Sequence, residues 1–268
     1  PITDDCIFET LKSLKANKAP GPDELNKEFF VATWDILGAD FCAAIKDYFA
    51  TSMIHKGVNS TLIALVPKVR TPSKMRDFRP ISLCTTMYKC ILKILASRLK
   101  KVMPSLIDKA QSAFVPGRQI SDNIILAQEL FRGYGREPGL PKCSLKLDLH
   151  KAFDSIGWDF LIKALVHMKF PQIFIRWIQG CVCHTYFSVK INGAAMGHFQ
   201  GAKGLRQGDP LSPYLFSLAM NVFYALLNEV PPEFKYHWKC KELRLTHLFF
   251  ADDVLIFTRG DKDSICHV

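Results

Sequence analysis

The feature that most constrains this chain is a pair of adjacent aspartates, Asp252 and Asp253, within an otherwise apolar run from His247 to Phe257. Either flank alone is typical of a buried β-strand. Carboxylates among such residues are costly unless an ion partner, backbone N–H donors or a metal compensates their charge. The pattern therefore predicts a hairpin with both carboxylates at its turn. The alternative is an ordinary surface hairpin, since aspartate is a common turn residue.

A third aspartate, Asp148, ends an alternating, strand-like segment that begins at Lys142. Alone it would be explained well as a helix N-cap. Phosphoryl transfer, however, uses two metal ions about 3.5–4 Å apart, and hard cations prefer carboxylate oxygens. Because a strand that ends beside the hairpin would complete a carboxylate set, we predict a Mg²⁺ site, with Mn²⁺ as the substitute ion, formed by Asp148, Asp252 and Asp253.

The net charge of +10 is concentrated in one part of the chain. Residues 61–118 contain twelve lysines and arginines but only two acidic residues, Asp77 and Asp108. Such a zone favours a polyanionic partner such as nucleic acid or nucleotide phosphates. A solvated helix face is the alternative for Lys89 to Lys101, because a complementary apolar stripe accompanies those lysines.

The nine cysteines form no C-x-x-C pair, which is typical of buried thiols in an intracellular protein. No apolar run approaches the roughly 20 residues of a membrane span, so no membrane association is expected. The polar N-terminus lacks an initiator methionine, and we therefore expect a fragment of a longer product.

Periodicity and turn signals predict an α+β layout rather than regular alternation of strands and helices. Helices are expected at residues 4–15, 24–37, 39–53, 88–103, 121–132, 158–168 and 214–227, the last beginning at Ser212-Pro213. Strands are expected at residues 61–68, 78–83, 142–148 and 185–191, and in the final hairpin. Asn192-Gly193 is a strong hairpin-turn signal.

Seven segments, taken together, resemble the ordered motifs of reverse transcriptases. Residues 145–153 (LKLDLHKAF), 204–213 (GLRQGDPLSP) and 250–253 (FADD) resemble motifs A, B and C. Residues 61–68 (TLIALVPK), 77–83 (DFRPISL) and 111–118 (QSAFVPGR) resemble finger motifs, and residues 20–23 (PGPD) resemble the preceding N-terminal motif. The match is most similar to non-LTR, LINE-type retrotransposon enzymes, particularly those of plant genomes.

This resemblance implies a right-hand polymerase fold, with an N-terminal extension and helical fingers in residues 1–140 and a palm with an antiparallel sheet in residues 141–268. Residues 61–268 would form the catalytic core, and the thumb would be missing. The implied activity is RNA-directed DNA polymerisation with an RNA template, a DNA primer or target and deoxynucleoside triphosphates (dNTPs). A nuclear location would follow from the family.

The resemblance also implies a role for each matched residue. Asp148, Asp252 and Asp253 would bind magnesium, and Phe153 would be the steric gate against a ribose 2′-hydroxyl. Gln207 would lie against the incoming nucleotide, while Lys68 and Arg79 would clamp its triphosphate. Gly204 and Gly208 would allow close backbone approach. Arg206 would contact the template or brace the loop, and Asp209 would brace the helix start.

Three alternatives remain at this point. An RNA-dependent RNA polymerase is disfavoured because the Phe153 ring would exclude the 2′-hydroxyl that such an enzyme must accept. A group II intron-type enzyme fits less well, because residues 206–209 read Arg-Gln-Gly-Asp. An inactive relic that only binds nucleic acid through its basic region is opposed by the retention of all seven predicted metal- and nucleotide-binding residues.

Overall fold

The computed structural model describes residues 1–134, 141–183 and 185–267. The chain forms two compact units: unit 1 comprises Pro1–Leu99 and Phe153–Leu215, and unit 2 comprises Lys100–Ala152 and Phe216–Val268. The two units are defined by contacts within the chain, whereas the terms fingers and palm refer to function. The predicted division of fingers and palm at residue 140 therefore stays a prediction.

Unit 1 contains a four-stranded sheet in the order β2-β1-β4-β5. Its strands are β1 (Ser60–Pro67), β2 (Phe78–Cys84), β4 (Tyr186–Ile191) and β5 (Ala194–Gln200). Only the β1–β4 pair is parallel; the other two pairs are antiparallel hairpins. The predicted turn between β4 and β5 is confirmed, since Asn192 and Gly193 have φ values of 49° and 87°.

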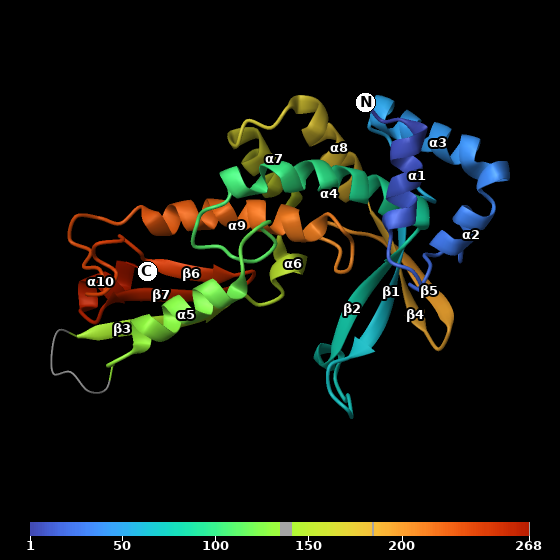
Figure 1. Cartoon of the computed structure of the whole chain (residues 1–268). Coiled ribbons are helices and arrows are strands. Elements are labelled where there is room, and N and C mark those ends of the chain that lie inside the picture. Colours follow the sequence, from blue (N-terminus) through green and yellow to red (C-terminus); the bar gives the residue numbers. More distant parts are fainter. Residues whose placement is uncertain (135–140, 184, 268) are drawn as a thin grey trace. The chain divides into compact units, whose positions relative to one another are not determined.

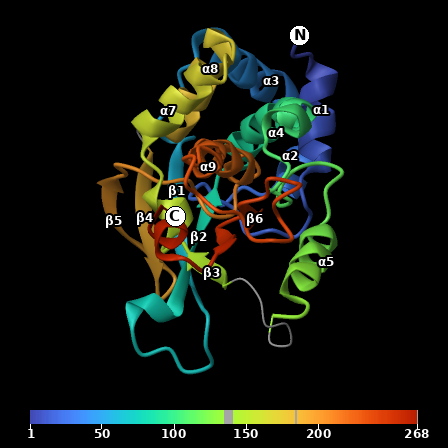
Figure 2. The same ribbon diagram turned by 90° about the vertical axis from the view of Figure 1, so that its left-hand side faces the viewer.

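The helices of unit 1 gather at one end of its sheet, and its two hairpins extend away from them (Figure 1, Figure 2). They are α1 (Asp4–Ser13), α2 (Lys27–Ala32), α3 (Trp34–Thr51), the first part of α4 (Thr86–Leu106), most of α6 (Ala152–Ser155), α7 (Trp158–His167), α8 (Gln172–Val182) and the start of α9 (Ser212–Asn228). A short 3-10 helix, Met75–Asp77, precedes β2. Asn26 caps α2 by accepting from the Phe29 N–H group.

One expected helix boundary was wrong, and one helix was not predicted. The break expected near Leu37 lies at Thr33, and α3 continues through Gly38, where a Cβ would lie 2.8 Å from Trp34 Cε2. Close packing of this aromatic ring thus explains the glycine better than a helix end does. Helix α8 was not predicted, although its residues Phe174, Ile175, Ile178 and Cys181 form a buried face.

The core of unit 1 joins α3, α4 and α8 through two buried tyrosines. The Tyr48 hydroxyl donates to the Trp177 carbonyl, and the Tyr88 hydroxyl donates to the Cys181 carbonyl at 3.1 Å. Gly180 allows close approach of α8, since a Cβ there would collide with the Ser52 carbonyl oxygen. Buried tyrosines need such partners for their hydroxyl groups.

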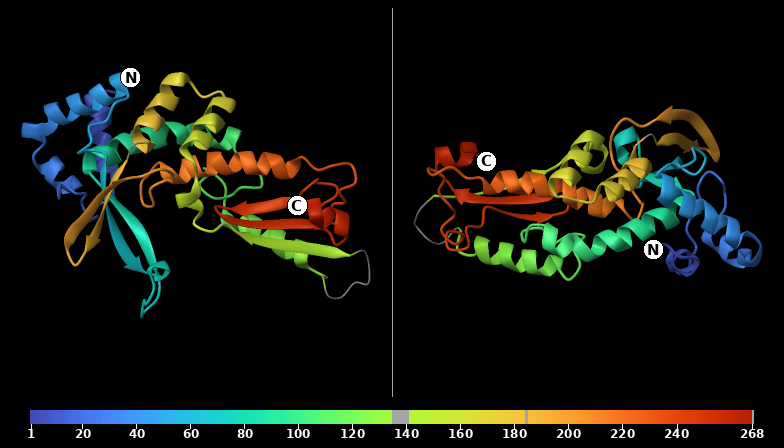
Figure 3. Two further views of the ribbon diagram at one scale, coloured as in Figure 1. Left: turned by 180° about the vertical axis from the view of Figure 1, so that it is seen from behind. Right: turned by 90° about the horizontal axis from the view of Figure 1, so that it is seen from above.

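Unit 2 contains a three-stranded antiparallel sheet in the order β3-β7-β6 (Figure 3). Its strands are β3 (Lys142–Asp148), β6 (His247–Phe250) and β7 (Asp253–Arg259), as predicted. Helix α5 (Ile120–Phe131), the later parts of α4 and α9, and α10 (Lys262–His267) complete this unit; α10 was not predicted. Leu130, Cys240, Leu248 and Phe257 form a buried cluster between α5 and the sheet. Within the three described ranges, no helix is long and apolar enough to cross a membrane.

Candidate active site

Three predicted carboxylates lie at one end of the unit 2 sheet. Phe250 and Asp253 face each other across the β6–β7 hairpin, so Ala251 and Asp252 form its two-residue turn. In the neighbouring ladder, Asp148 is the cross-strand partner of Asp253. The hairpin predicted from the sequence is present, and strand register brings the third aspartate beside it.

The surroundings of these carboxylates differ from the buried setting that the apolar run suggested. Phe249 and Val254 are buried, but the Asp253 side chain is 53% exposed and Asp148 is also exposed. Strand alternation explains this, because Asp253 and the buried Val254 point to opposite faces of the sheet, and the face that carries Asp148 and Asp253 is open to solvent. The Asp253 carboxylate pairs with the Lys146 ammonium at 3.2 Å.

The backbone geometry and the donor chemistry suit a divalent cation. Asp148 and Asp253 are cross-strand partners whose like charges repel when unscreened, and a cation would remove that repulsion. Their oxygens are ligands that hard cations prefer. In the described ranges, no three histidine, cysteine or acidic side chains are already gathered into a metal-binding cluster. Side-chain rotation would therefore have to accompany binding at this end of the sheet.

The segment QSAFVPGR, which was expected to be a finger motif, lies in unit 2 beside this hairpin. Gln111 forms a parallel bridge with Phe249 of β6, and the Ser112 N–H group donates to the Phe249 carbonyl at 3.3 Å. Arg118 donates to the carbonyls of Gln111 and Ile107 and holds the turn after α4. This part of the motif therefore supports the carboxylate hairpin.

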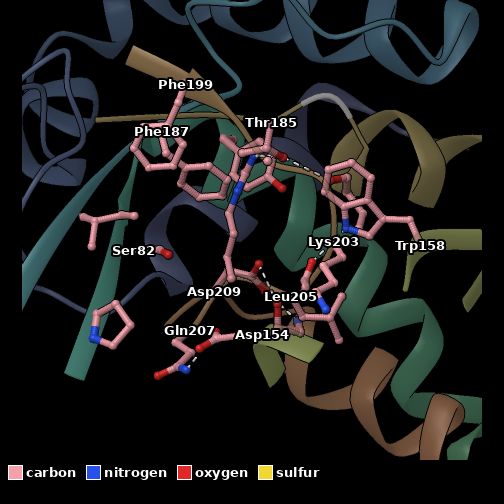
Figure 4. A pocket seen from close by; sticks show the side chains of 18 residues that line it. Ser82, Asp154, Trp158, Thr185, Phe187, Phe199, Lys203, Leu205, Gln207 and Asp209 are labelled. Carbon is pink, nitrogen blue, oxygen red and sulfur yellow. Dashed lines mark hydrogen bonds between the residues drawn. The ribbon is translucent and has the colours of Figure 1, made fainter. Parts of the chain in front are cut away.

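In unit 1, the loop of motif B is joined to the residues that follow motif A. The Leu205 N–H group donates to the Phe153 carbonyl at 2.8 Å, and the Gly204 N–H group donates to the Ile156 carbonyl at 2.7 Å. The Gln207 side chain donates to the Asp154 carboxylate at 3.1 Å, as Figure 4 shows. Phe153 and Gln207, which were predicted to contact the same nucleotide, thus belong to two directly bonded segments.

The two predicted glycines differ in what their backbones approach. Gly204 has a φ of 93°, and a Cβ there would lie 2.9 Å from the Asp154 carbonyl oxygen. Gly208 has a φ of 106°, and the atom nearest to a Cβ there would be the Ser82 carbonyl oxygen at 3.6 Å. Both positions need glycine for their positive φ, and Gly204 also needs it for close packing against this chain's own backbone. Their approach to template or nucleotide stays a prediction.

Arg206 is buried, and this burial favours bracing of the loop over template contact. Its guanidinium donates to Thr185 Oγ1 at 2.6 Å and to both the carbonyl and side-chain oxygens of Asn59. It also lies over the Tyr88 ring at 4.2 Å, a cation–π contact. Asn59 and Thr185 immediately precede β1 and β4. Arg206 therefore ties the motif B loop to the residues just before two paired strands.

Asp209 has the bracing role that the sequence suggested. One of its carboxylate oxygens accepts from the N–H groups of Leu211 and Ser212, and the other accepts from the Ser212 hydroxyl at 2.8 Å. The side chain that satisfies the start of α9 is thus Asp209 and not Ser212. Burial raises the pKa of the Asp209 carboxyl, while these hydrogen bonds and nearby Arg206 oppose that rise.

Lys68 and Arg79 lie where β1 ends and β2 begins, next to the connection between these two strands. Arg79 is the cross-strand partner of Val66, and the Lys68 N–H group donates to the Asp77 carbonyl at 2.7 Å. The Lys68 ammonium donates to the Arg76 carbonyl at 3.3 Å. Both cations are exposed and stay on one hairpin, as a clamp for a triphosphate would need.

Unit 1 also contains a cavity of about 270 Å³ beside the motif B loop (Figure 4). Its lining includes Ser82, Asp154, Trp158, Phe187 and Gln207. Asp154 and Trp158 were not assigned roles from the sequence, although Asp154 directly follows Phe153. The Trp158 indole N–H group donates to the Gly204 carbonyl at 2.8 Å, a contact that only the fold reveals.

Comparison with known proteins identifies the family. The reverse transcriptase (RNA-dependent DNA polymerase) family matches residues 66–268. The chain is 34% identical over 263 residues to the transposon TX1 uncharacterized 149 kDa protein of Xenopus laevis, covering 98% of this chain and 20% of that protein. It is 31% identical over 193 residues to the retrovirus-related Pol polyprotein of the type-2 retrotransposable element R2DM of Drosophila melanogaster. That alignment covers 72% of this chain and 17% of that protein. The chain thus spans about a fifth of the length of these relatives.

A solved structure shares the fold. Apo telomerase from Candida tropicalis, truncated from its C-terminal domain, aligns with a TM-score of 0.52 at 14% identity, covering 92% of this chain and 53% of that chain. This similarity confirms the α+β, right-hand polymerase fold. Reverse transcriptases generally depend on divalent metal ions, which agrees with the donor chemistry at the hairpin. The chain belongs to the reverse transcriptase family and is related to the enzymes of LINE-type, non-LTR retrotransposons.

Proposed function

We propose that this chain carries the polymerase site of an RNA-directed DNA polymerase of a LINE-type retrotransposon. The observation that carries the proposal is the register that sets Asp148 opposite Asp253 at the end where Asp252 forms the turn. The reaction would add dNTPs to the 3′-hydroxyl of a DNA primer on an RNA template. An intracellular, nuclear location belongs to the same proposal.

Asp148, Asp252 and Asp253 would hold Mg²⁺, with Mn²⁺ as its substitute. Bound there, the ions would activate the primer hydroxyl and stabilise the charge of the leaving pyrophosphate. The exposed side of the hairpin suits this role, since the carboxylates are open to a large polyanionic substrate. Lys146 would release Asp253 when the cation binds.

The remaining residues would select and orient the nucleotide. Phe153 would exclude the ribose 2′-hydroxyl, and Gln207, held by Asp154, would lie near the sugar. Lys68 and Arg79 would bind the triphosphate. Gly204 and Gly208 would shape the loop on which Gln207 is carried, and Arg206 would fix that loop to the sheet.

Primer extension on an RNA template tests the proposal. Wild-type chain, the D252N variant and a matched surface variant, D263N, would be compared with Mg²⁺ and all four dNTPs. DNA synthesis by wild type and D263N but not by D252N would support the proposal. Magnesium-independent RNA binding that weakens steeply with salt, without any synthesis, would instead support the relic that only binds nucleic acid.

A further inference from the structure

Gln111 is a buried amide that contacts the turn carrying Asp252. Its side-chain oxygen accepts from the Ala251 N–H group at 3.2 Å and from the Ala113 N–H group at 2.8 Å. Because both partners are donors, the oxygen and not the amide nitrogen must face them. The nitrogen donates to the Tyr224 hydroxyl, which fixes the orientation of the amide.

Ala251 adopts an unfavourable backbone conformation. Its φ is 57°, in the left-handed region, where the Cβ of an L-residue crowds the following carbonyl oxygen. It is only 7% exposed, so an N–H group left without an acceptor there would add a desolvation cost. The Gln111 oxygen satisfies that group in this conformation. A compensated strained residue immediately before Asp252 indicates a turn held in one shape by its surroundings.

We infer that Gln111 is a positioning residue for the catalytic carboxylates. By binding the Ala251 N–H group, it holds the turn from which Asp252 and Asp253 project. The inference rests on the proposed function of those carboxylates. It also gives a role to the first residue of QSAFVPGR, which the motif assignment left without one.

Asn123 provides a matched control, because it contributes to packing in the same region without contacting the turn. The Asn123 amide donates to the Ala110 carbonyl at 3.0 Å and to the Phe249 carbonyl at 2.9 Å. It therefore ties together the same two segments as Gln111 does, but its bonds do not reach Ala251. Loss of Asn123 should weaken the packing of this region without releasing the turn.

The test measures Mn²⁺ binding to the whole chain. The electron paramagnetic resonance signal of free Mn²⁺ reports how much of the ion stays unbound. We expect Q111M to bind Mn²⁺ about tenfold more weakly than wild type, the cost of losing an outer-shell partner. N123L should stay within about twofold of wild type.

Equal losses in Q111M and N123L, or wild-type affinity in Q111M, would overturn the inference. If Q111M does not fold, Q111N, which withdraws the oxygen by one methylene, is measured in its place with the same criterion. D252N distinguishes a wrong metal assignment from a wrong role for Gln111. Equal binding of Mn²⁺ by wild type and D252N would contradict the metal assignment itself, whereas weaker binding by D252N with unchanged Q111M would contradict only the role of Gln111.

Discussion

Asp148 and Asp253 face each other across adjacent antiparallel strands, although 105 positions separate them in the chain. The β3–β7 ladder runs without a shift from Lys142–Arg259 to this pair, so the backbones of the two residues cannot be moved apart without disturbing the sheet. Buried apolar residues of β7, among them Val254, Ile256 and Phe257, fix that register from one side of the ladder.

Replacing Asp253 should abolish the activity that we propose. D253N removes a charge from the cross-strand pair while keeping the shape of the side chain. We expect DNA synthesis to fall by more than about a hundredfold, beyond the usual cost of an outer-shell change. Primer extension measures this, with the exposed D263N as control. Substantial synthesis by D253N would remove Asp253 from the ligand set.

Phe153 should govern the choice between deoxyribonucleotides and ribonucleotides. F153A opens space beside the sugar, and we expect discrimination against ribonucleotides to fall by about tenfold or more, the scale of a steric contact in a binding pocket. Relative kcat/KM values for a dNTP and its ribonucleotide measure it. F170A, which alters an aromatic residue elsewhere in unit 1, is the control. Unchanged discrimination would make Phe153 a packing residue only.

Lys146 should compete with the metal for Asp253. The pair is solvent-exposed, so its strength is at most about 1 kcal/mol, and K146M should lower the Mg²⁺ concentration for half-maximal activity by up to about fivefold. A magnesium titration measures this shift, with K190M, on β4 of unit 1, as the control. A higher magnesium requirement in K146M would show that Lys146 assists binding of substrate instead.

Lys68 and Arg79 should act on the nucleotide more than on the template. Reversing both charges with K68E and R79E should raise the apparent KM for dNTPs by about tenfold or more, since each lost charge-assisted contact is worth about 1.5–3 kcal/mol. K74E, on the same hairpin connection, is the control. A loss of RNA affinity at unchanged KM would transfer the two residues to the template path.

His247 should make unit 2 less stable in mild acid. Burial lowers the pKa of His247 to about 4 from 6.5, and nearby Asp108 opposes only part of this shift. As pH falls below 6.5 the unfolded chain binds a proton that the folded chain excludes, so stability is lost down to about pH 4, on the order of 3 kcal/mol. Denaturant unfolding at pH 7 and pH 5 measures this. H247F should flatten the dependence, while H55Q, at an exposed site, should leave it unchanged.

The sequence by itself determined the local elements and the chemistry of the candidate site. Alternation from Lys142 to Asp148 and the apolar flanks of Asp252-Asp253 were sufficient to place all three strands of unit 2, because side-chain period and turn residues are local properties. The ordered motifs likewise determined the family. Gly38 led to a wrong helix boundary, because this glycine allows close packing against Trp34 and does not end a helix.

Only the tertiary structure decided which of these residues meet. Strand register, to which the buried residues of β7 contribute, paired Asp148 with Asp253. Arg206 of the motif B loop is buried through contacts with Asn59 and Thr185, which lie outside that loop in the sequence. The bond from Gln111 to the Ala251 N–H group depends on the same kind of long-range packing, which no local pattern in the sequence encodes.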